Sequence, residues 1–257
     1  MSIELRLEDH VATVTINRSE VLNALSTELL EELLSTLAVP AEGREARVVI
    51  LTGQGERAFI AGADITEMAR MTTLEARSYS ELGQECAHRL ETMRKPTIAA
   101  VNGFALGGGC EMALACDIRL GSTNARFGQP EITLGLIPGW GGTQRLARTT
   151  TIGYAKELIL SGRMVGAEEA LQRGLVNALH APDELMPKAF ELARTMAAQS
   201  PVALAYAKDA TNRALHGDIG ANLVHEADLF GILFSTEDAR EGMTAFNEKR
   251  PPSFVGR

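Results

Sequence analysis

The sequence predicts an α/β fold with a helical C-terminal region, and three observations support this. Apolar, strand-like runs alternate with helical patterns from residue 1 to about residue 140. From Gly139 onward helical patterns dominate, and only Leu175–Leu179 looks extended. Three consecutive glycines, Gly107 to Gly109, stand where a buried strand would pass into a helix. Because 257 residues approach the limit of one hydrophobic core, we expect a main core over residues 1–195 and a helical region over residues 196–257.

The N-terminal half is expected to begin with a hairpin. Ile3–Leu7 and Val11–Ile16 alternate apolar and polar side chains around a short turn. Ser26 is a suitable N-cap for a helix whose leucines recur at helical spacing. The other expected elements are strands at 47–52, 97–102 and 117–120, and helices at 73–94 and 110–116.

The C-terminal half is expected to be mainly helical. Its expected helices cover residues 142–148, 151–160, 167–173, 183–199, 201–216, 219–233 and 236–249. No internal repeat or low-complexity segment interrupts this pattern. A layer of helices following an α/β core is the simplest architecture that these patterns predict.

Composition excludes several classes of protein. The net charge of −8 argues against nucleic acid as the main partner, because phosphate backbones require a basic surface. No run of eighteen apolar residues predicts a membrane span, and no signal or transit segment is expected. Three cysteines without paired spacing predict free, buried thiols and a reducing, cytoplasmic location. The scattered histidines form no metal-ligand pattern, so no metal site is expected.

The glycine run at Gly107–Gly109 predicts a site for negative charge on oxygen. Glycines allow a ligand to approach backbone N–H groups, and the N-terminus of a helix adds a favourable dipole. The spacing does not fit the G-x-G-x-x-G pattern of a dinucleotide site, and no phosphate-binding G-K-[ST] sequence follows. A tight packing turn is the alternative. One glycine would suffice for packing, so three in a row favour exposed N–H groups.

Two acidic residues lie in apolar, glycine- and proline-rich surroundings. Glu111 follows the glycine run among small apolar neighbours, and Glu131 lies in a strongly punctuated loop. Each alone has a simpler explanation, as a surface carboxylate at a helix start or an ordinary loop acid. Together they suit acid–base chemistry, because different surroundings can separate their pKa values. The helix N-terminus is expected to favour the ionised form of Glu111, which leaves Glu131 the more adjustable proton.

A second glycine turn lies at Phe59–Asp64, where Gly62 permits close approach to the backbone. An oxyanion hole needs two N–H donors from separate segments, and this turn is the best candidate for the second. A plain loop with Asp64 as a helix cap is the alternative. The sequence does not decide whether Trp140 lines a pocket or packs in the core.

These segments together resemble the enoyl-CoA hydratase/isomerase (crotonase) family along nearly the whole chain. The most specific stretches are Ala61-Gly-Ala-Asp-Ile65, Ala105-Leu-Gly-Gly-Gly-Cys-Glu-Met-Ala113, Phe127-Gly-Gln-Pro-Glu131 and Pro138-Gly-x-Gly-Gly-Thr-Gln-Arg-Leu146. The resemblance implies a spiral of ββα turns and a C-terminal helical region that forms trimers or dimers of trimers and covers the active site. It also implies acyl-CoA thioester substrates, a role in fatty acid β-oxidation and no cofactor, since coenzyme A belongs to the substrate.

The resemblance also implies roles for particular residues. The backbone N–H groups of Ala63 and Gly108 would bind the thioester oxygen, and Glu111 and Glu131 would be the catalytic acids. The residues implied in binding coenzyme A are Arg57, Ala61, Asp64, Ile65 and Lys249, the last near a subunit boundary. Where the family often has Lys two residues after Asp64, this chain has Thr66, which leaves one phosphate contact without its usual lysine but does not change the coenzyme A assignment.

The expected activity is hydration of a trans-2-enoyl-CoA to a 3-hydroxyacyl-CoA. The nearest alternative is a double-bond isomerase or another reaction of the same fold, such as decarboxylation or thioester hydrolysis. The presence of both acids favours hydration, because an isomerase needs only one. A non-catalytic scaffold that binds acyl-CoA or RNA is a further alternative, which the acid pair and the acidic pI of about 5.3 disfavour.

Overall fold

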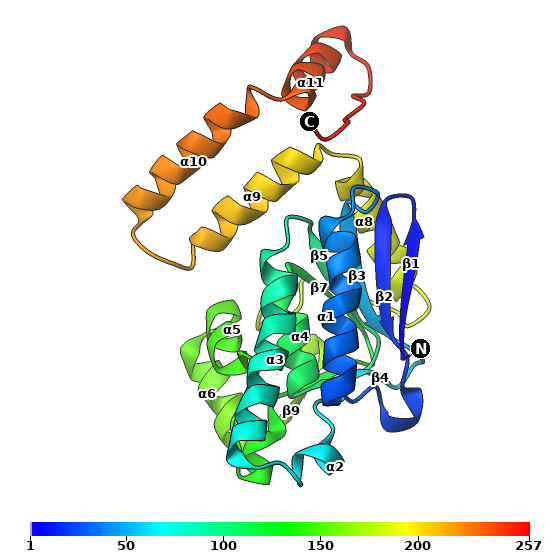
Figure 1. Ribbon diagram of the computed structural model, residues 1–257, viewed down its shortest axis with the longest axis vertical. Coiled ribbons are helices and arrows are strands. Elements are labelled where there is room, and N and C mark those ends of the chain that lie inside the picture. The colour runs from blue at the N-terminus through cyan, green and yellow to red at the C-terminus, as the bar shows by residue number, and fades with distance from the viewer. Residues whose placement is uncertain (1) are drawn as a thin grey trace.

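The computed structural model describes residues 2–257, and its strands form two sheets (Figure 1). The six-stranded sheet has the order β1-β2-β3-β5-β7-β10, and the four-stranded sheet has the order β4-β6-β8-β9. The first contains β1 (Ile3–Glu8), β2 (Val11–Ile16), β3 (Val48–Gly53), β5 (Thr97–Val101), β7 (Ile118–Ser122) and β10 (Ala178–His180). The second contains β4 (Ala58–Ile60), β6 (Phe104–Leu106), β8 (Arg126–Gly128) and β9 (Met164–Gly166).

The helices follow the strands around the body and then leave it as an arm. The body helices are α1 (Thr27–Glu42), α2 (Ile65–Met68), α3 (Thr73–Thr92), α4 (Gly108–Ala115), α5 (Gly142–Thr149), α6 (Ile152–Ser161), α7 (Ala167–Gln172) and α8 (Leu185–Ala197). The arm helices are α9 (Pro201–Arg213), α10 (Ile219–Leu233) and α11 (Glu237–Glu248). Two short 3-10 helices are η1 (Ser19–Val21) and η2 (Pro130–Leu134).

The chain winds as a spiral in which each turn contributes one strand to each sheet and then a helix. The successive turns are β3–β4–α3, β5–β6–α4 and β7–β8–α5. The strands β3, β5 and β7 pair in parallel, as do β4, β6 and β8. Helices α1, α3, α4, α5 and α6 pack against one another in chain order. The predicted α/β fold with ββα turns is confirmed.

The six-stranded sheet is covered on both faces, which explains the continuous apolar run of β3. Val49 and Leu51 belong to the main core with α1, α3 and α4, whereas Val48 and Ile50 pack against α8. The predicted hairpin is confirmed, and its turn residues Asp9 and His10 have positive φ. The three cysteines are buried and free, as predicted.

The strand β5 does not run directly into the glycine-rich helix, contrary to the prediction. It ends at Val101, and the chain crosses to the other sheet before β6 begins. The side-chain amide of Asn102 holds this crossing, because its nitrogen donates to the carbonyls of Gly53, Gly55 and Ala58 at 2.8, 2.5 and 3.2 Å. The strands β6, β8 and β9 have three residues each, too few to produce a periodic pattern. The expectation that only 175–179 would be extended in the C-terminal half was therefore wrong.

The arm begins after α8, which ends at Ala197. Helix α8 stays against the six-stranded sheet to its last residue, Ala197, which is buried. Helices α9 and α10 then project from the body as a hairpin (Figure 1). Large apolar side chains of α10 are exposed, among them Ile219 at 76% and Phe230 at 64%. Within residues 2–257, no helix is long and apolar enough to cross a membrane.

Candidate active site

The site-forming segments meet at one edge of the four-stranded sheet. The parallel strands β4, β6 and β8 lie side by side, with Ile60 opposite Ala105 and Ala105 opposite Phe127. Parallel neighbours end at the same edge, so the segments that follow them lie together. These segments are residues 61–64, 107–111 and 129–131.

Several backbone N–H groups at this edge have no acceptor within residues 2–257, among them those of Ala63 and Gly108. Bonds on either side of Ala63 fix its loop, because Leu25 donates to the Gly62 carbonyl and accepts from the Asp64 N–H, both at 2.9 Å. The N–H of Gly108 is free because the first residues of a helix have no partner one turn earlier. These groups can therefore donate to a ligand.

Backbone conformation explains one glycine of the run, and close packing explains the other two. Gly107 has a φ of +49°, and its N–H donates to the Gly128 carbonyl at 2.9 Å. A Cβ on Gly108 would lie 2.1 Å from the Trp140 ring, and one on Gly109 would lie 1.8 Å from the Ile60 carbonyl oxygen. Close packing thus explains two of the glycines, which corrects the argument that one would suffice for packing.

Glu111 projects from the first turn of α4 and is buried, with 2% of its surface exposed. One carboxylate oxygen, Oε1, accepts the N–H groups of Trp140 at 2.7 Å and Gly142 at 2.6 Å. Burial raises the pKa of Glu111 to about 7, and the negative charge of Glu131 adds to this rise. The two N–H donors oppose the rise only in part.

Glu131 lies in η2 with its carboxylate against the glycine run. A Cβ on Gly107 would lie 3.0 Å from Oε1 of Glu131. The amide of the buried Gln129, oriented with its nitrogen toward this carboxylate, donates to its two oxygens at 2.9 and 3.3 Å. Burial raises the pKa of Glu131 to about 7 as well. Both acids therefore have pKa values near 7, and the expected preference for an ionised Glu111 is not found.

The residues implied in binding coenzyme A divide into two groups. Ala61, Asp64 and Ile65 follow β4 beside Ala63 in the chain, whereas Arg57 precedes β4. Asp64 caps α2, which was the alternative considered for it, because its Oδ1 accepts the backbone N–H groups of Thr66 and residue 67 at 3.1 and 3.4 Å. Lys249 ends α11, and Figure 1 shows α11 and α2 at opposite ends of the molecule. The single chain therefore does not bring Lys249 to this edge.

Three further residues shape the site. The sequence did not single out Gln129 and Arg145, and it left the role of Trp140 undecided. Gln129 orients toward Glu131, Trp140 packs on Gly108 and contributes an N–H to Glu111, and Arg145 supports the Trp140 turn. The only signal in the sequence was the position of Gln129 and Arg145 inside the motifs that carry the resemblance. Within residues 2–257, no group of three or more His, Cys, Asp or Glu side chains could hold a metal ion.

A spiral of ββα turns with free N–H groups, one buried and one half-buried carboxyl at one sheet edge defines a protein of the crotonase fold. The chain belongs to the enoyl-CoA hydratase/isomerase family, whose sequence model matches residues 6–257. It is 51% identical to the short-chain-enoyl-CoA hydratase of Clostridium acetobutylicum over 97% of this chain and 95% of that protein. It is 43% identical to the crotonyl-CoA hydratase of Syntrophomonas wolfei over 100% of this chain and 98% of that protein.

A solved structure of the same family matches the whole chain. The crystal structure of the enoyl-CoA hydratase from Bacillus anthracis superimposes with a TM-score of 0.97 at 41% identity, and the match covers 100% of both chains. Relatives and solved structures thus agree on the family over the whole length of the chain, including the arm.

Proposed function

We propose that the protein adds water to the C2–C3 double bond of a trans-2-enoyl-CoA and forms a 3-hydroxyacyl-CoA. One observation carries the proposal: the buried Glu111 and the half-buried Glu131 lie at the edge that holds the free N–H groups of Ala63 and Gly108, and burial raises both pKa values. Acids with pKa values near 7 can both accept and donate protons at neutral pH. The names of the relatives, short-chain-enoyl-CoA hydratase and crotonyl-CoA hydratase, support the same activity.

In the proposed reaction, the thioester oxygen accepts hydrogen bonds from Ala63 and Gly108. When water attacks C3, the negative charge moves to this oxygen as an enolate, and the two donors stabilise it. Glu111 binds the water and helps to remove its proton, while Glu131 exchanges the proton at C2 and shares the same water. The hydroxyl adds to C3 and a proton adds to C2, so the reaction needs no metal or redox cofactor.

The proposal extends to the rest of the substrate and to the assembly. Arg57, Ala61, Asp64 and Ile65 would bind the coenzyme A portion beside the site. Lys249 would reach the nucleotide only from another subunit, because α11 lies far from this edge in its own chain (Figure 1). Residues 196–257 would form a trimer or a dimer of trimers and cover the active site, and the exposed apolar face of α10 supports this role. A role in β-oxidation and a cytoplasmic location stay predictions.

The test is the loss of enoyl absorbance when crotonyl-CoA is added. Glu111→Gln and Glu131→Gln should each lower kcat by orders of magnitude and leave the affinity for acyl-CoA nearly unchanged. Glu20→Gln, at an exposed position outside the site, is the control and should behave like the unmodified protein. Turnover of a 3-enoyl-CoA without hydration would make the protein an isomerase. Binding without any turnover would make it a scaffold. A series of substrates from four to sixteen carbons would then define chain length.

A further inference from the structure

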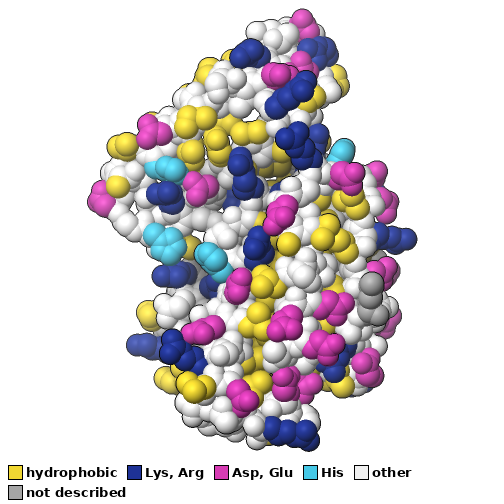
Figure 2. Space-filling view, in the orientation of Figure 1, with side chains coloured by type: hydrophobic (Ala, Val, Ile, Leu, Met, Phe, Trp, Pro, Cys, Tyr) yellow, Lys and Arg dark blue, Asp and Glu magenta, His cyan; other side chains and the backbone are white. Residues whose placement is uncertain are grey.

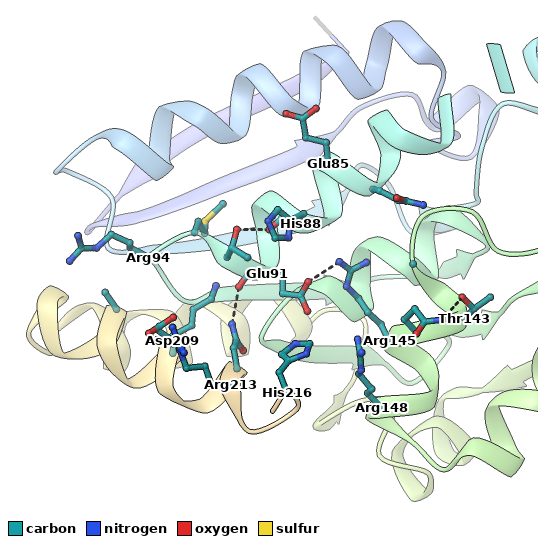
Figure 3. Close-up of a pocket in the computed structure, with 18 of the residues that line it drawn as sticks. Glu85, His88, Glu91, Arg94, Thr143, Arg145, Arg148, Asp209, Arg213 and His216 are labelled. Atoms are coloured by element: carbon teal, nitrogen blue, oxygen red, sulfur yellow. Dashed lines mark hydrogen bonds and ion pairs between the residues drawn. The ribbon is translucent and has the colours of Figure 1, made fainter. Parts of the chain in front are cut away.

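A cavity of about 1190 Å³ lies between the body and the arm. Basic and histidine side chains gather along this cavity (Figure 2), and its walls belong to α3, α5 and α9 (Figure 3). Arg145 lies on its inner wall and points toward Glu91 (Figure 3). From its contacts we infer that Arg145, together with Ser80 and Gln84, positions Glu111 by holding the turn at residues 139–142. This inference rests on the proposed function.

The turn needs external support, because it holds Glu111 through backbone groups alone. Glu111 accepts from the N–H groups of Trp140 and Gly142, which flank Gly141. Gly141 has a φ of +109°, a conformation that a glycine leaves easily. The peptide that carries the Gly142 N–H is held by α5, because Gln144 and Arg145 donate their backbone N–H groups to the Gly141 carbonyl at 3.0 and 2.9 Å. The two peptides before it, from residue 139 to residue 141, need other partners, because otherwise the N–H of Trp140 can rotate away from the carboxylate.

Ser80 and Gln84 on α3 fix the first of these peptides. Ser80 Oγ and Gln84 Nε2 donate to the carbonyl oxygen of Gly139 at 2.6 and 2.8 Å. A trans peptide is planar, so its C=O and N–H point in opposite directions. When α3 binds the Gly139 carbonyl on one side, the N–H of Trp140 is directed to Glu111 on the other.

Arg145 fixes the next peptide, which joins Trp140 to Gly141. Its Nη1 donates to the carbonyl oxygen of Trp140 at 2.9 Å, and its Nη2 pairs with Oε2 of Glu91 at 2.8 Å. The side chains of Arg145 and Glu91 are 13% and 33% exposed, so the pair is shielded from solvent. Because the guanidinium is planar and rigid, the ion pair of Nη2 with Glu91 also sets the direction in which Nη1 donates to the Trp140 carbonyl. A Cβ on Gly141 would lie 2.2 Å from Nη1, so the guanidinium also occupies the space beside the turn.

Arg145 also acts on Glu111 through its charge. The carboxylate of Glu111 is influenced by Glu131 on η2, which raises its pKa, and by Arg145 on α5, which lowers it. Glu91 on α3 faces the guanidinium itself. The other charged groups on the cavity wall include His88, Arg148, Lys208, Asp209, Arg213 and His216. Loss of the guanidinium should therefore misplace Glu111 and raise its pKa further.

The experiment compares Arg145→Gln with Arg148→Gln, which removes a charge from the same helix and cavity. Hydration of crotonyl-CoA by the unmodified protein is established first, so that failure of the proposed function is recognised on its own. Arg145→Gln should then lower kcat by about 10²-fold, as expected for a displacement of about 1 Å. KM should change little, and Arg148→Gln should match the unmodified protein.

A second readout does not depend on turnover. The pKa of Glu111 is measured by carboxyl ¹³C titration, with the Glu111→Gln variant to assign the signal. Arg145→Gln should raise this pKa, and Arg145→Lys should return it toward the original value without restoring kcat. Ser80→Ala removes one hydrogen bond to the Gly139 carbonyl and should lower kcat without changing the pKa of Glu111. This variant replaces Arg145→Gln as the test if Arg145→Gln does not fold. Unchanged kcat and unchanged Glu111 pKa in folded Arg145→Gln would overturn the inference, as would an equal effect of Arg148→Gln.

Discussion

Replacing Gly108 with alanine tests the packing of the glycine run against Trp140. The added Cβ would lie 2.1, 2.4 and 2.9 Å from three carbons of the indole ring, whereas ordinary contact begins near 3.4 Å. A rigid ring must therefore retreat by about 1.3 Å. Overpacking of this kind lowers the free energy of unfolding by about 1–3 kcal/mol.

The same displacement should reach the chemistry, because the N–H of Trp140 binds Glu111 at 2.7 Å. A shift of about 1 Å in such a group lowers turnover by about 10²-fold. Urea unfolding at a fixed protein concentration measures the stability change, and crotonyl-CoA hydration measures the change in kcat. Gly153→Ala is the matched control, since a Cβ there meets nothing within 4 Å.

A double variant identifies the cause. Trp140→Leu removes the ring that the new methyl group would strike, so Gly108→Ala should have little further effect on stability in that background. The two changes should therefore be non-additive by about 1 kcal/mol or more. Additive effects, or a Gly108→Ala protein as stable and active as Gly153→Ala, would refute the reasoning.

Three other predictions concern buried charges. Burial raises the pKa of Glu111 from 4.5 to about 7, so folding favours its protonated form. The free energy of unfolding of Glu111→Gln should therefore exceed that of the original protein by up to about 3 kcal/mol above pH 7, and the two should be equal below pH 4.5. Urea unfolding measures the difference. Asp238→Ala should lose about 3 kcal/mol, because Asp238 accepts Ser200 Oγ and two tail N–H groups; trypsin should then cleave the tail faster. Lys208→Met should cost about 3–5 kcal/mol by leaving Asp117 unpaired, and adding Asp117→Asn should recover part of it.

Much of the fold could be predicted because its signals are local. The strands of the hairpin alternate over six residues each, and Ser26 accepts the N–H of Leu29 as a helix cap should. Strands of three residues carry no such signal. The start of β6, for example, follows the crossing at Asn102, whose amide binds residues more than forty positions away in the sequence.

The candidate site was predictable in part for the same reason. The small apolar neighbours of Glu111 indicated its burial, which is confirmed. Its partners could not be predicted, because Trp140 and Gly142 lie 29 and 31 residues away. The effect of that burial on the pKa also exceeded the expected effect of the helix N-terminus. The catalytic roles of Glu111 and Glu131 came from the resemblance and stay predictions.

The ends of β4, β6 and β8 meet at one edge, and this arrangement bears on how proteins of this fold could evolve different reactions. The groups left to bind an anionic oxygen are main-chain N–H groups, which mutation can displace but, short of proline, cannot delete. The proposed proton-transferring groups are two side chains, each exchangeable by a single codon. Under the proposed function, a lineage that retains this chain path keeps the N–H groups that bind the thioester while it exchanges the acids. New reactions would arise on this scaffold by substitution at positions 111 and 131, with no change in the course of the backbone.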